Sequence, residues 1–62
     1  MKIKELRLAA GLTQVQLAKM MEVSQSTVVG WEQGSYPPAK KLPALAEALG
    51  VTINDLYKPE SA

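Results

Sequence analysis

The chain has 62 residues and a net charge of +1, and it contains neither cysteine nor histidine. A chain this short forms one domain and buries only about 60% of the surface that its unfolded state exposes. Without residues for a disulfide or a zinc site, we expect a core of closely packed helices and no cofactor. No apolar run reaches the roughly 18 residues of a membrane span and no signal sequence is evident, which favours a cytoplasmic location.

Charge is distributed unevenly along the chain. Residues 1–41 carry six of the seven basic side chains and three acidic ones, a balance of +3, whereas residues 42–62 have a balance of −2. The N-terminal part is therefore better suited to contact phosphate groups. Ordinary solvated surface charge explains the same pattern, so charge alone does not decide the partner.

Turn and capping signals separate the first three predicted helices. Gly11 ends the first helix, Thr13 and Ser24 are the N-caps of the second and third, and Gly34 ends the third. Apolar residues recur at helical spacing in these segments, at Ile3, Leu6, Ala10, Leu17, Ala18, Met21, Val28 and Trp31. This spacing predicts one buried face on each helix, with Trp31 in the core rather than stacked on a base.

A turn-rich loop from Ser35 to Ala39 precedes the fourth predicted helix. This helix begins late, at about Lys41, because Pro43 is tolerated in a first turn but not in a helix interior. Gly50 ends it. Its inward positions are Leu42, Leu45, Ala46 and Leu49.

A capping-box pattern formed by Thr52 and Asp55 opens a fifth helix, which ends near Tyr57. Nothing in the sequence predicts a strand. We therefore predict an all-α fold, a compact five-helix bundle over residues 1–57, with a frayed C-terminal tail at residues 58–62.

The second and third predicted helices are joined by about four residues, 21–24, which is typical of a helix-turn-helix. The small side chain of Ala18 lets the two backbones approach closely at a steep angle. This crossing leaves a slim, largely polar outer face on the third helix, made by Gln25, Ser26, Val29, Gly30 and Gln33. Such a face fits a major groove about 12 Å wide.

Motifs along the whole chain carry a family resemblance. They are Leu6-Arg7, Gly11-Leu12-Thr13-Gln14, Leu17-Ala18, Val23-Ser24, Val28, Trp31-Glu32, Gly34, Leu45-Ala46, Leu49-Gly50-Val51 and Leu56. In this order and spacing the chain resembles the Cro/repressor (XRE-like) helix-turn-helix family, and residues 42–51 are especially similar to lambdoid phage repressor domains. Glu22 departs from the family, which usually has glycine in this turn, and a left-handed conformation there costs about 1 kcal/mol.

The resemblance implies sequence-specific binding to double-stranded DNA by a small transcription regulator of the repressor type, encoded by a bacterium or a phage. The third helix would enter the major groove of a near-palindromic operator. Activation instead of repression needs only a few surface residues that touch polymerase, so the sequence does not fix the sign of regulation.

Five residues on the outer face of the third helix are candidates for reading bases. Gln25 is expected to pair with N6 and N7 of adenine, and Ser26 with a base or a phosphate. Val29 suits a thymine methyl group, with core packing as the alternative. Gly30 costs about 1 kcal/mol in a helix interior, which either close approach to DNA or simple tolerance explains. Gln33 completes the set at the end of the helix.

A second set of residues is expected to hold the DNA backbone. Gln14 lies at the start of the second helix, where its side chain and the free N–H groups can bind a phosphate, a role that the resemblance also implies. A plain polar residue at a helix start is the alternative. The other candidates for phosphate contact are Thr13, Thr27, Ser35, Tyr36 and Lys40. Lys41 adds charge beside Lys40, and a solvated helix start explains both lysines equally well.

The resemblance also implies a partly buried ion pair between Arg7 and Glu32, with Arg7 on a phosphate as the rival interpretation. An exposed apolar patch at Ile53, Leu56 and Tyr57 is expected to form a two-fold homodimer, at least on DNA. Such dimers place two recognition helices about 34 Å apart.

An enzyme is not expected, because the chain lacks histidine and cysteine and its carboxylates are scattered. The serious alternative is a protein-interaction role, with polymerase or a toxin as partner. The face between Gln25 and Gly30 has no acidic residue, which favours DNA. We expect no small-molecule ligand, because the chain leaves no room for an effector domain unless it is a trimmed domain of a longer repressor.

Overall fold

Five α-helices and one short 3-10 helix are present in the computed structural model, which describes residues 1–57. The α-helices are α1 (Ile3–Ala9), α2 (Gln14–Met21), α3 (Gln25–Glu32), α4 (Leu42–Leu49) and α5 (Ile53–Tyr57), and the 3-10 helix η1 (Ala39–Lys41) precedes α4. The predicted all-α fold is confirmed, and no strand occurs within residues 1–57. The predicted tail, residues 58–62, lies outside the described residues. No helix in the described range is long and apolar enough to cross a membrane.

Side chains at the helix starts satisfy backbone N–H groups that have no partner within the helix. At α2, Thr13 Oγ1 accepts from the backbone N–H of Gln16 over 3.0 Å, and Gln16 Oε1 accepts from that of Thr13 over 2.8 Å. Ser24 Oγ accepts a backbone N–H of the first turn of α3. Thr52 and Asp55 cap α5 by two reciprocal bonds. The predicted caps are confirmed. At α2 the sequence predicted only the N-cap Thr13, and Gln16 completes a capping box with it.

The core takes one fully buried side chain from each α-helix: Ile3, Leu17, Val28, Leu45 and Leu56. Trp31 lies among them, as predicted, together with Ala18, Met21, Ala46 and Leu49. The prediction for Ala10 was wrong, because this residue caps the end of α1 and is exposed. Arg7, one helical turn after Ile3, is the second buried residue of α1.

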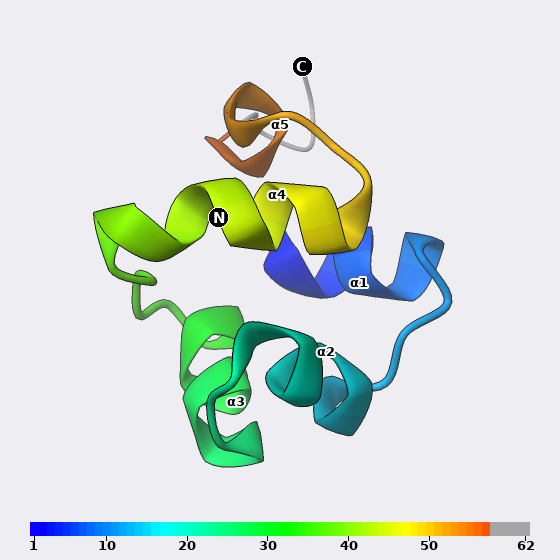
Figure 1. Cartoon of the computed structure of the whole chain (residues 1–62), viewed down its shortest axis with the longest axis vertical. Coiled ribbons are helices and arrows are strands. Elements are labelled where there is room, and N and C mark those ends of the chain that lie inside the picture. The colour runs from blue at the N-terminus through cyan, green and yellow to red at the C-terminus, as the bar shows by residue number, and fades with distance from the viewer. Residues whose placement is uncertain (58–62) are drawn as a thin grey trace.

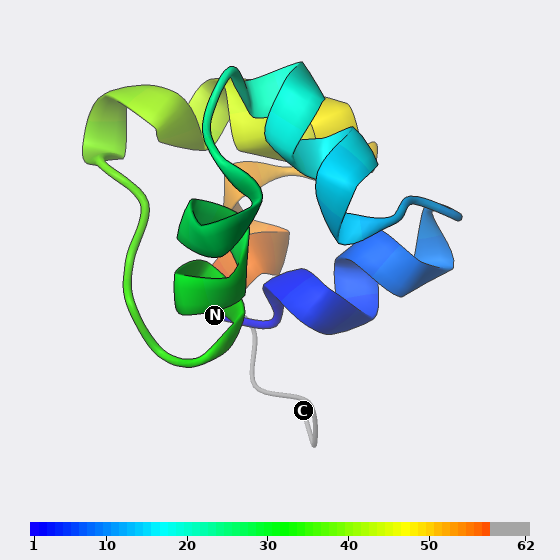
Figure 2. The ribbon, with the colours of Figure 1, turned by 90° about the horizontal axis from the view of Figure 1, so that it is seen from below.

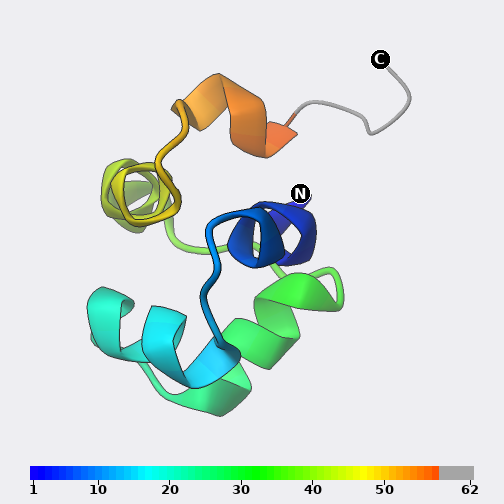
Figure 3. The ribbon, with the colours of Figure 1, turned by 90° about the vertical axis from the view of Figure 1, so that its right-hand side faces the viewer.

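The helix-turn-helix pair occupies one end of the molecule. α2 and α3 lie together there, α5 lies at the opposite end, and α1 and α4 lie between them (Figure 1). The same order is visible from the side (Figure 3). The loop that leaves α3 runs round the side of the molecule to η1 (Figure 2), and Pro37 in this loop is buried. The outer surface of α2 and α3 is therefore left uncovered by the other residues in the range 1–57.

Candidate nucleic-acid interface

The outer face of α3 lies on the side of the helix away from its core residues. Of the two neighbouring valines, Val28 is fully buried and Val29 is half-buried, so they point to different sides. The candidate base-reading residues are exposed at Gln25, Ser26 and Gln33 and half-buried at Val29 and Gly30. This face is slim and carries no charged side chain before Glu32, at the end of the helix.

Gly30 is not required by the geometry of the fold. Its φ is not in the left-handed region, unlike that of Gly11, Gly34 and Gly50. A Cβ added at Gly30 would meet Ser35 Oγ at 3.8 Å, which is ordinary van der Waals contact. An alanine would therefore fit here as far as residues 1–57 are concerned, and contacts within this range do not explain the glycine.

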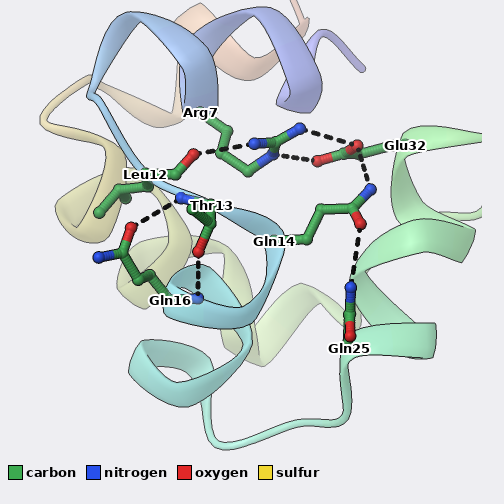
Figure 4. Close-up of polar contacts among 7 residues, drawn as sticks. All are labelled: Arg7, Leu12, Thr13, Gln14, Gln16, Gln25 and Glu32. Atoms are coloured by element: carbon green, nitrogen blue, oxygen red, sulfur yellow. Dashed lines mark hydrogen bonds and ion pairs between the residues drawn. The ribbon is translucent and has the colours of Figure 1, made fainter.

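Gln14 and Gln25 connect the first turns of α2 and α3. Gln25 Nε2 donates to Gln14 Oε1 over 3.3 Å, and Gln14 Nε2 donates to Glu32 Oε1 over 3.1 Å. Gln14 therefore lies between the two ends of α3 (Figure 4). Sequence reasoning expected Gln14 at the helix start but not its bond to Glu32, which depends on how α2 crosses α3.

Arg7 and Glu32 form the ion pair that the resemblance implied. Arg7 Nε donates to Glu32 Oε2 over 2.6 Å and Arg7 Nη2 to Glu32 Oε1 over 3.4 Å, so the pairing is bidentate. The two side chains are only 8% and 5% exposed. Arg7 Nη1 also donates to the carbonyl of Leu12 over 2.8 Å, which fastens the segment that leads into α2. All three nitrogen atoms of the Arg7 guanidinium therefore donate hydrogen bonds to groups within the protein.

Two opposing effects act on the pKa of Glu32. Burial raises it, but hydrogen bonds from Arg7 and Gln14 and the charges of Arg7 and Lys4 together outweigh burial. The net result is a pKa below the ordinary value of 4.5. Glu32 is therefore an ionised acceptor at neutral pH.

Buried polar side chains in the described part of the chain find partners within the protein. Among residues 1–57, no buried side-chain nitrogen or oxygen lacks a hydrogen bond. The same range contains no group of three or more acidic side chains placed to hold a metal ion. The chemistry that this surface offers is hydrogen bonding by amides, hydroxyls and helix ends.

Comparison with known families decides the class of the protein. The family model described as helix-turn-helix matches residues 3–56, which is nearly the whole chain. The chain belongs to the helix-turn-helix family. Among its relatives, the HTH-type transcriptional activator BcrR of Enterococcus faecalis is 37% identical over 95% of this chain, but the chain spans only 29% of that protein.

Two archaeal relatives match over most of their own length. An uncharacterised HTH-type transcriptional regulator of Methanocaldococcus jannaschii is 40% identical over 90% of this chain and 86% of its own. One of Archaeoglobus fulgidus is 37% identical over 90% of this chain and 81% of its own. This helix-turn-helix chain is therefore similar both to nearly whole small proteins and to one segment of a larger one.

The candidate phosphate contacts of this helix-turn-helix chain fall into two groups. Thr13 and Gln14 lie at the start of α2, where the Thr13 hydroxyl already accepts the backbone N–H of Gln16 in the capping box. Thr27 is half-buried, and its hydroxyl lies 2.9 Å from Ser24 Oγ, so it is turned toward the cap of α3. The second group, in and after the loop that follows α3, consists of the exposed Ser35, Tyr36 and Lys40. No hydrogen bond among residues 1–57 joins this second group to Gln14 or Gln25.

The turn of the helix-turn-helix has a left-handed residue at Glu22, with φ 58° and ψ 44°. It is the one non-glycine residue with positive φ between residues 1 and 57. Lys41 Nζ donates to the carbonyl of Met21, directly before Glu22, over 3.3 Å. Lys41 therefore caps the end of α2, a role that depends on the path of the loop and that its sequence position did not reveal.

The predicted dimer patch needs a correction. Leu56 is 0% exposed, because the inner side of α5 packs it into the core, so it is not available to a second chain. Ile53 and Tyr57 are 40% and 55% exposed. The apolar surface of α5 is thus smaller than the sequence suggested, and it lies at the end of the molecule opposite α3 (Figure 3).

Proposed function

We propose that this chain binds double-stranded DNA in a sequence-specific manner and regulates transcription, with α3 in the major groove. The observation that carries the proposal is the hydrogen bond between Gln14 and Gln25. It brings the start of α2 beside the outer face of α3, so that one surface offers a phosphate contact and a base contact side by side. The names of the relatives, all HTH-type transcription regulators, support the same class.

Direct reading of bases belongs to α3. Gln25 offers Oε1 and one N–H group to the N6 donor and the N7 acceptor of adenine. Ser26 and Gln33 are exposed on the same helix and add polar contacts, and Val29 offers its methyl groups to thymine. Gly30 allows close approach of the helix backbone to DNA, which would account for a glycine that the fold does not need.

Binding of phosphate belongs mainly to the start of α2. The capping box occupies the backbone N–H groups of Thr13 and Gln16, which leaves those of Gln14 and Val15 for an anion. The positive end of the helix dipole favours a phosphate there. Further backbone contacts come from the remaining polar candidates, which are Thr13, Thr27, Ser35, Tyr36 and Lys40.

The regulator acts as a homodimer on a near-palindromic operator in this proposal. Ile53 and Tyr57 supply the exposed apolar surface for the two-fold contact. Half-sites one helical turn apart require the two copies of α3 to lie about 34 Å apart. Sedimentation at micromolar concentration, with and without operator DNA, tests this: monomer alone in both samples rules the dimer out.

Repression is the sign of regulation that we propose, although one relative is named an activator. A reporter gene measures the sign when the selected operator is placed either over the promoter or upstream of it. We expect expression to fall in the first arrangement. A rise in the second arrangement, without a fall in the first, would identify an activator.

Selection of bound sites from random duplexes tests the function directly. We expect enrichment of one near-palindromic site, and a pool without enrichment contradicts the proposal. Gln25→Ala should remove the preference at one position of each half-site, at a cost of about 1–3 kcal/mol. Gln14→Ala should weaken binding to all sequences through the lost phosphate contact and, because Gln14 holds the Gln25 amide, should also loosen the preference at that one position. Ala9→Ser, exposed on α1 and outside the proposed DNA and dimer contacts, is the control and should change neither.

A second candidate function is binding of a protein partner such as polymerase or a toxin. It is favoured by exposed apolar side chains elsewhere on the surface, with Leu8 58% and Met20 51% exposed. Met20 also lines a shallow depression between α2 and α4, with Ala44, Glu47 and Ala48. If Met20→Lys abolishes regulation in the reporter but leaves DNA affinity unchanged, a partner binds here. Unchanged regulation excludes this surface.

A further inference from the structure

Four side chains from three helices form a continuous chain of hydrogen bonds that ends at the exposed Gln25 (Figure 4). Arg7 donates to Glu32 from one side, and Gln14 Nε2 donates to Glu32 Oε1 over 3.1 Å from the other. Gln25 Nε2 then donates to Gln14 Oε1 over 3.3 Å. Every bond in this chain, which we call the Glu32 chain, runs toward the carboxylate.

The chemistry of Glu32 dictates this direction. A carboxylate only accepts hydrogen bonds and a guanidinium only donates them. An amide can turn by half a rotation and exchange donor for acceptor, so its partner decides which atom faces it. Gln14 must turn its nitrogen toward Glu32 and therefore its oxygen toward Gln25. Gln25 in turn must face Gln14 with its nitrogen.

We propose that Glu32, acting through Gln14, determines which base Gln25 reads, an inference that rests on the proposed DNA binding. With one N–H group committed to Gln14, Gln25 retains one N–H group and Oε1. Adenine matches this pair, because its major-groove edge has one acceptor, N7, and one donor, N6. Guanine does not, because N7 and O6 are both acceptors and Gln25 has one donor left. Glu32 is thus a positioning residue that touches no base.

Glu32→Gln is expected to reverse the donor-to-acceptor direction of every hydrogen bond between residue 32 and Gln25 in the Glu32 chain. Arg7 still only donates, so it takes the oxygen of the new amide and leaves the amide nitrogen facing Gln14. Gln14 then accepts with its oxygen and turns its nitrogen toward Gln25. Gln25 now accepts with Oε1 and has both N–H groups free for the two acceptors of guanine.

The quantity to measure is base preference at the position that Gln25 reads. Gln25→Ala identifies this position, and competition among duplexes with each of the four base pairs there gives the preference. We expect the wild type to favour adenine over guanine by about tenfold or more, and Glu32→Gln to lose or invert that ratio. A ratio of two affinities measured on the same protein does not depend on the fraction of that protein that is folded.

Arg7→Met is the matched control. It removes the same ion pair but leaves the Glu32 carboxylate, and with it the direction of the Glu32 chain, in place. At mildly alkaline pH it should keep the wild-type preference for adenine. If both variants change the preference equally, or neither changes it, the inference is wrong while DNA binding stands. A wild type that selects no sequence overturns the proposed function and the inference with it.

The free protein gives a second readout that needs neither DNA nor a variant. In a pH titration followed by NMR, the side-chain amide protons of Gln14 should shift as Glu32 is protonated, because they face its carboxylate. Those of Gln16 should not, because this amide caps α2 through its oxygen. If the Gln14 amide protons do not follow the titration, the proposed direction of the Glu32 chain is wrong.

Discussion

Gln25 Nε2 lies 3.3 Å from Gln14 Oε1, and this contact joins side chains that are 11 positions apart in the sequence. Through Gln14 it connects an exposed residue of α3 to Glu32, whose side chain is 5% exposed. A side chain held by such a network loses less conformational freedom when it binds a target. The exposed Gln25 is thus held in place by a hydrogen-bond network that ends at a buried carboxylate.

Gly30→Ala separates the requirements of the fold from those of DNA binding. The new Cβ would meet Ser35 Oγ at an ordinary 3.8 Å, so we expect the free energy of unfolding to rise by about 1 kcal/mol, since alanine is the better helix former. DNA affinity should fall, because the methyl group would stand between α3 and the groove. Urea denaturation and fluorescence anisotropy measure the two effects. Unchanged affinity would remove Gly30 from the interface.

Glu22→Gly should stabilise the turn between α2 and α3. Glu22 has a φ of 58°, and removal of its Cβ relieves about 1 kcal/mol of strain, part of which is offset by the greater freedom of glycine in the unfolded chain. Glu22→Ala is the control, because it removes the same charge but keeps a Cβ. Thermal unfolding should rank the glycine variant above the alanine variant. Equal stabilities would mean that the left-handed residue carries little strain.

Stability should depend on the ionisation of Glu32. Its pKa in the folded protein is below the ordinary 4.5, so its stabilising contribution is fully present above that value and is lost as the pH falls through the folded-state pKa. Between neutral pH and about pH 3, the wild type should therefore lose more stability than Glu32→Gln, which cannot titrate there. Urea denaturation at several pH values measures both. Parallel curves for the two proteins would contradict the lowered pKa.

Lys40 and Lys41 are neighbours with different expected roles. Lys41→Met removes an ammonium group from the carbonyl end of α2, so the free energy of unfolding should fall by about 0.3–1 kcal/mol. Lys40→Met, at an exposed position, should leave stability unchanged but make the salt dependence of DNA binding shallower by about one unit of slope. Denaturation and binding at several salt concentrations distinguish them. If Lys40→Met lowers stability and Lys41→Met changes the salt dependence of DNA binding, the two roles are assigned the wrong way round.

Local signals predicted most of the helix boundaries. Thr13 and Ser24 cap the helices that they were expected to cap, and Pro43 lies in the first turn of α4, as the position of a proline within a helix requires. These features depend on a few consecutive residues, whose chemistry is visible in the sequence. Ala10 was misplaced because apolar spacing continues past the residue at which α1 ends.

Features that depend on contact between distant segments could not be predicted in the same way. Leu56 and Ile53 are both apolar, and only the packing of α5 decides that Leu56 is buried while Ile53 remains 40% exposed. The bonds from Gln14 to Glu32 and from Lys41 to Met21 join residues 18 and 20 positions apart. The sequence analysis singled out Gln14, Gln25 and Glu32, but the hydrogen bonds that join them could not be predicted from it.

The core in which each α-helix buries one side chain completely also couples recognition to folding. An isolated helix shorter than about 12 residues is hardly stable in water, and α3 has only 8. α3 therefore keeps its shape only while Val28 lies in the core that it shares with buried side chains of the other four helices, which are Ile3, Leu17, Leu45 and Leu56. The unfolded chain has no recognition surface, so the amount of active regulator in a cell cannot exceed the amount of folded chain. A destabilising change anywhere in this core would act on gene expression as a lower dose of the regulator.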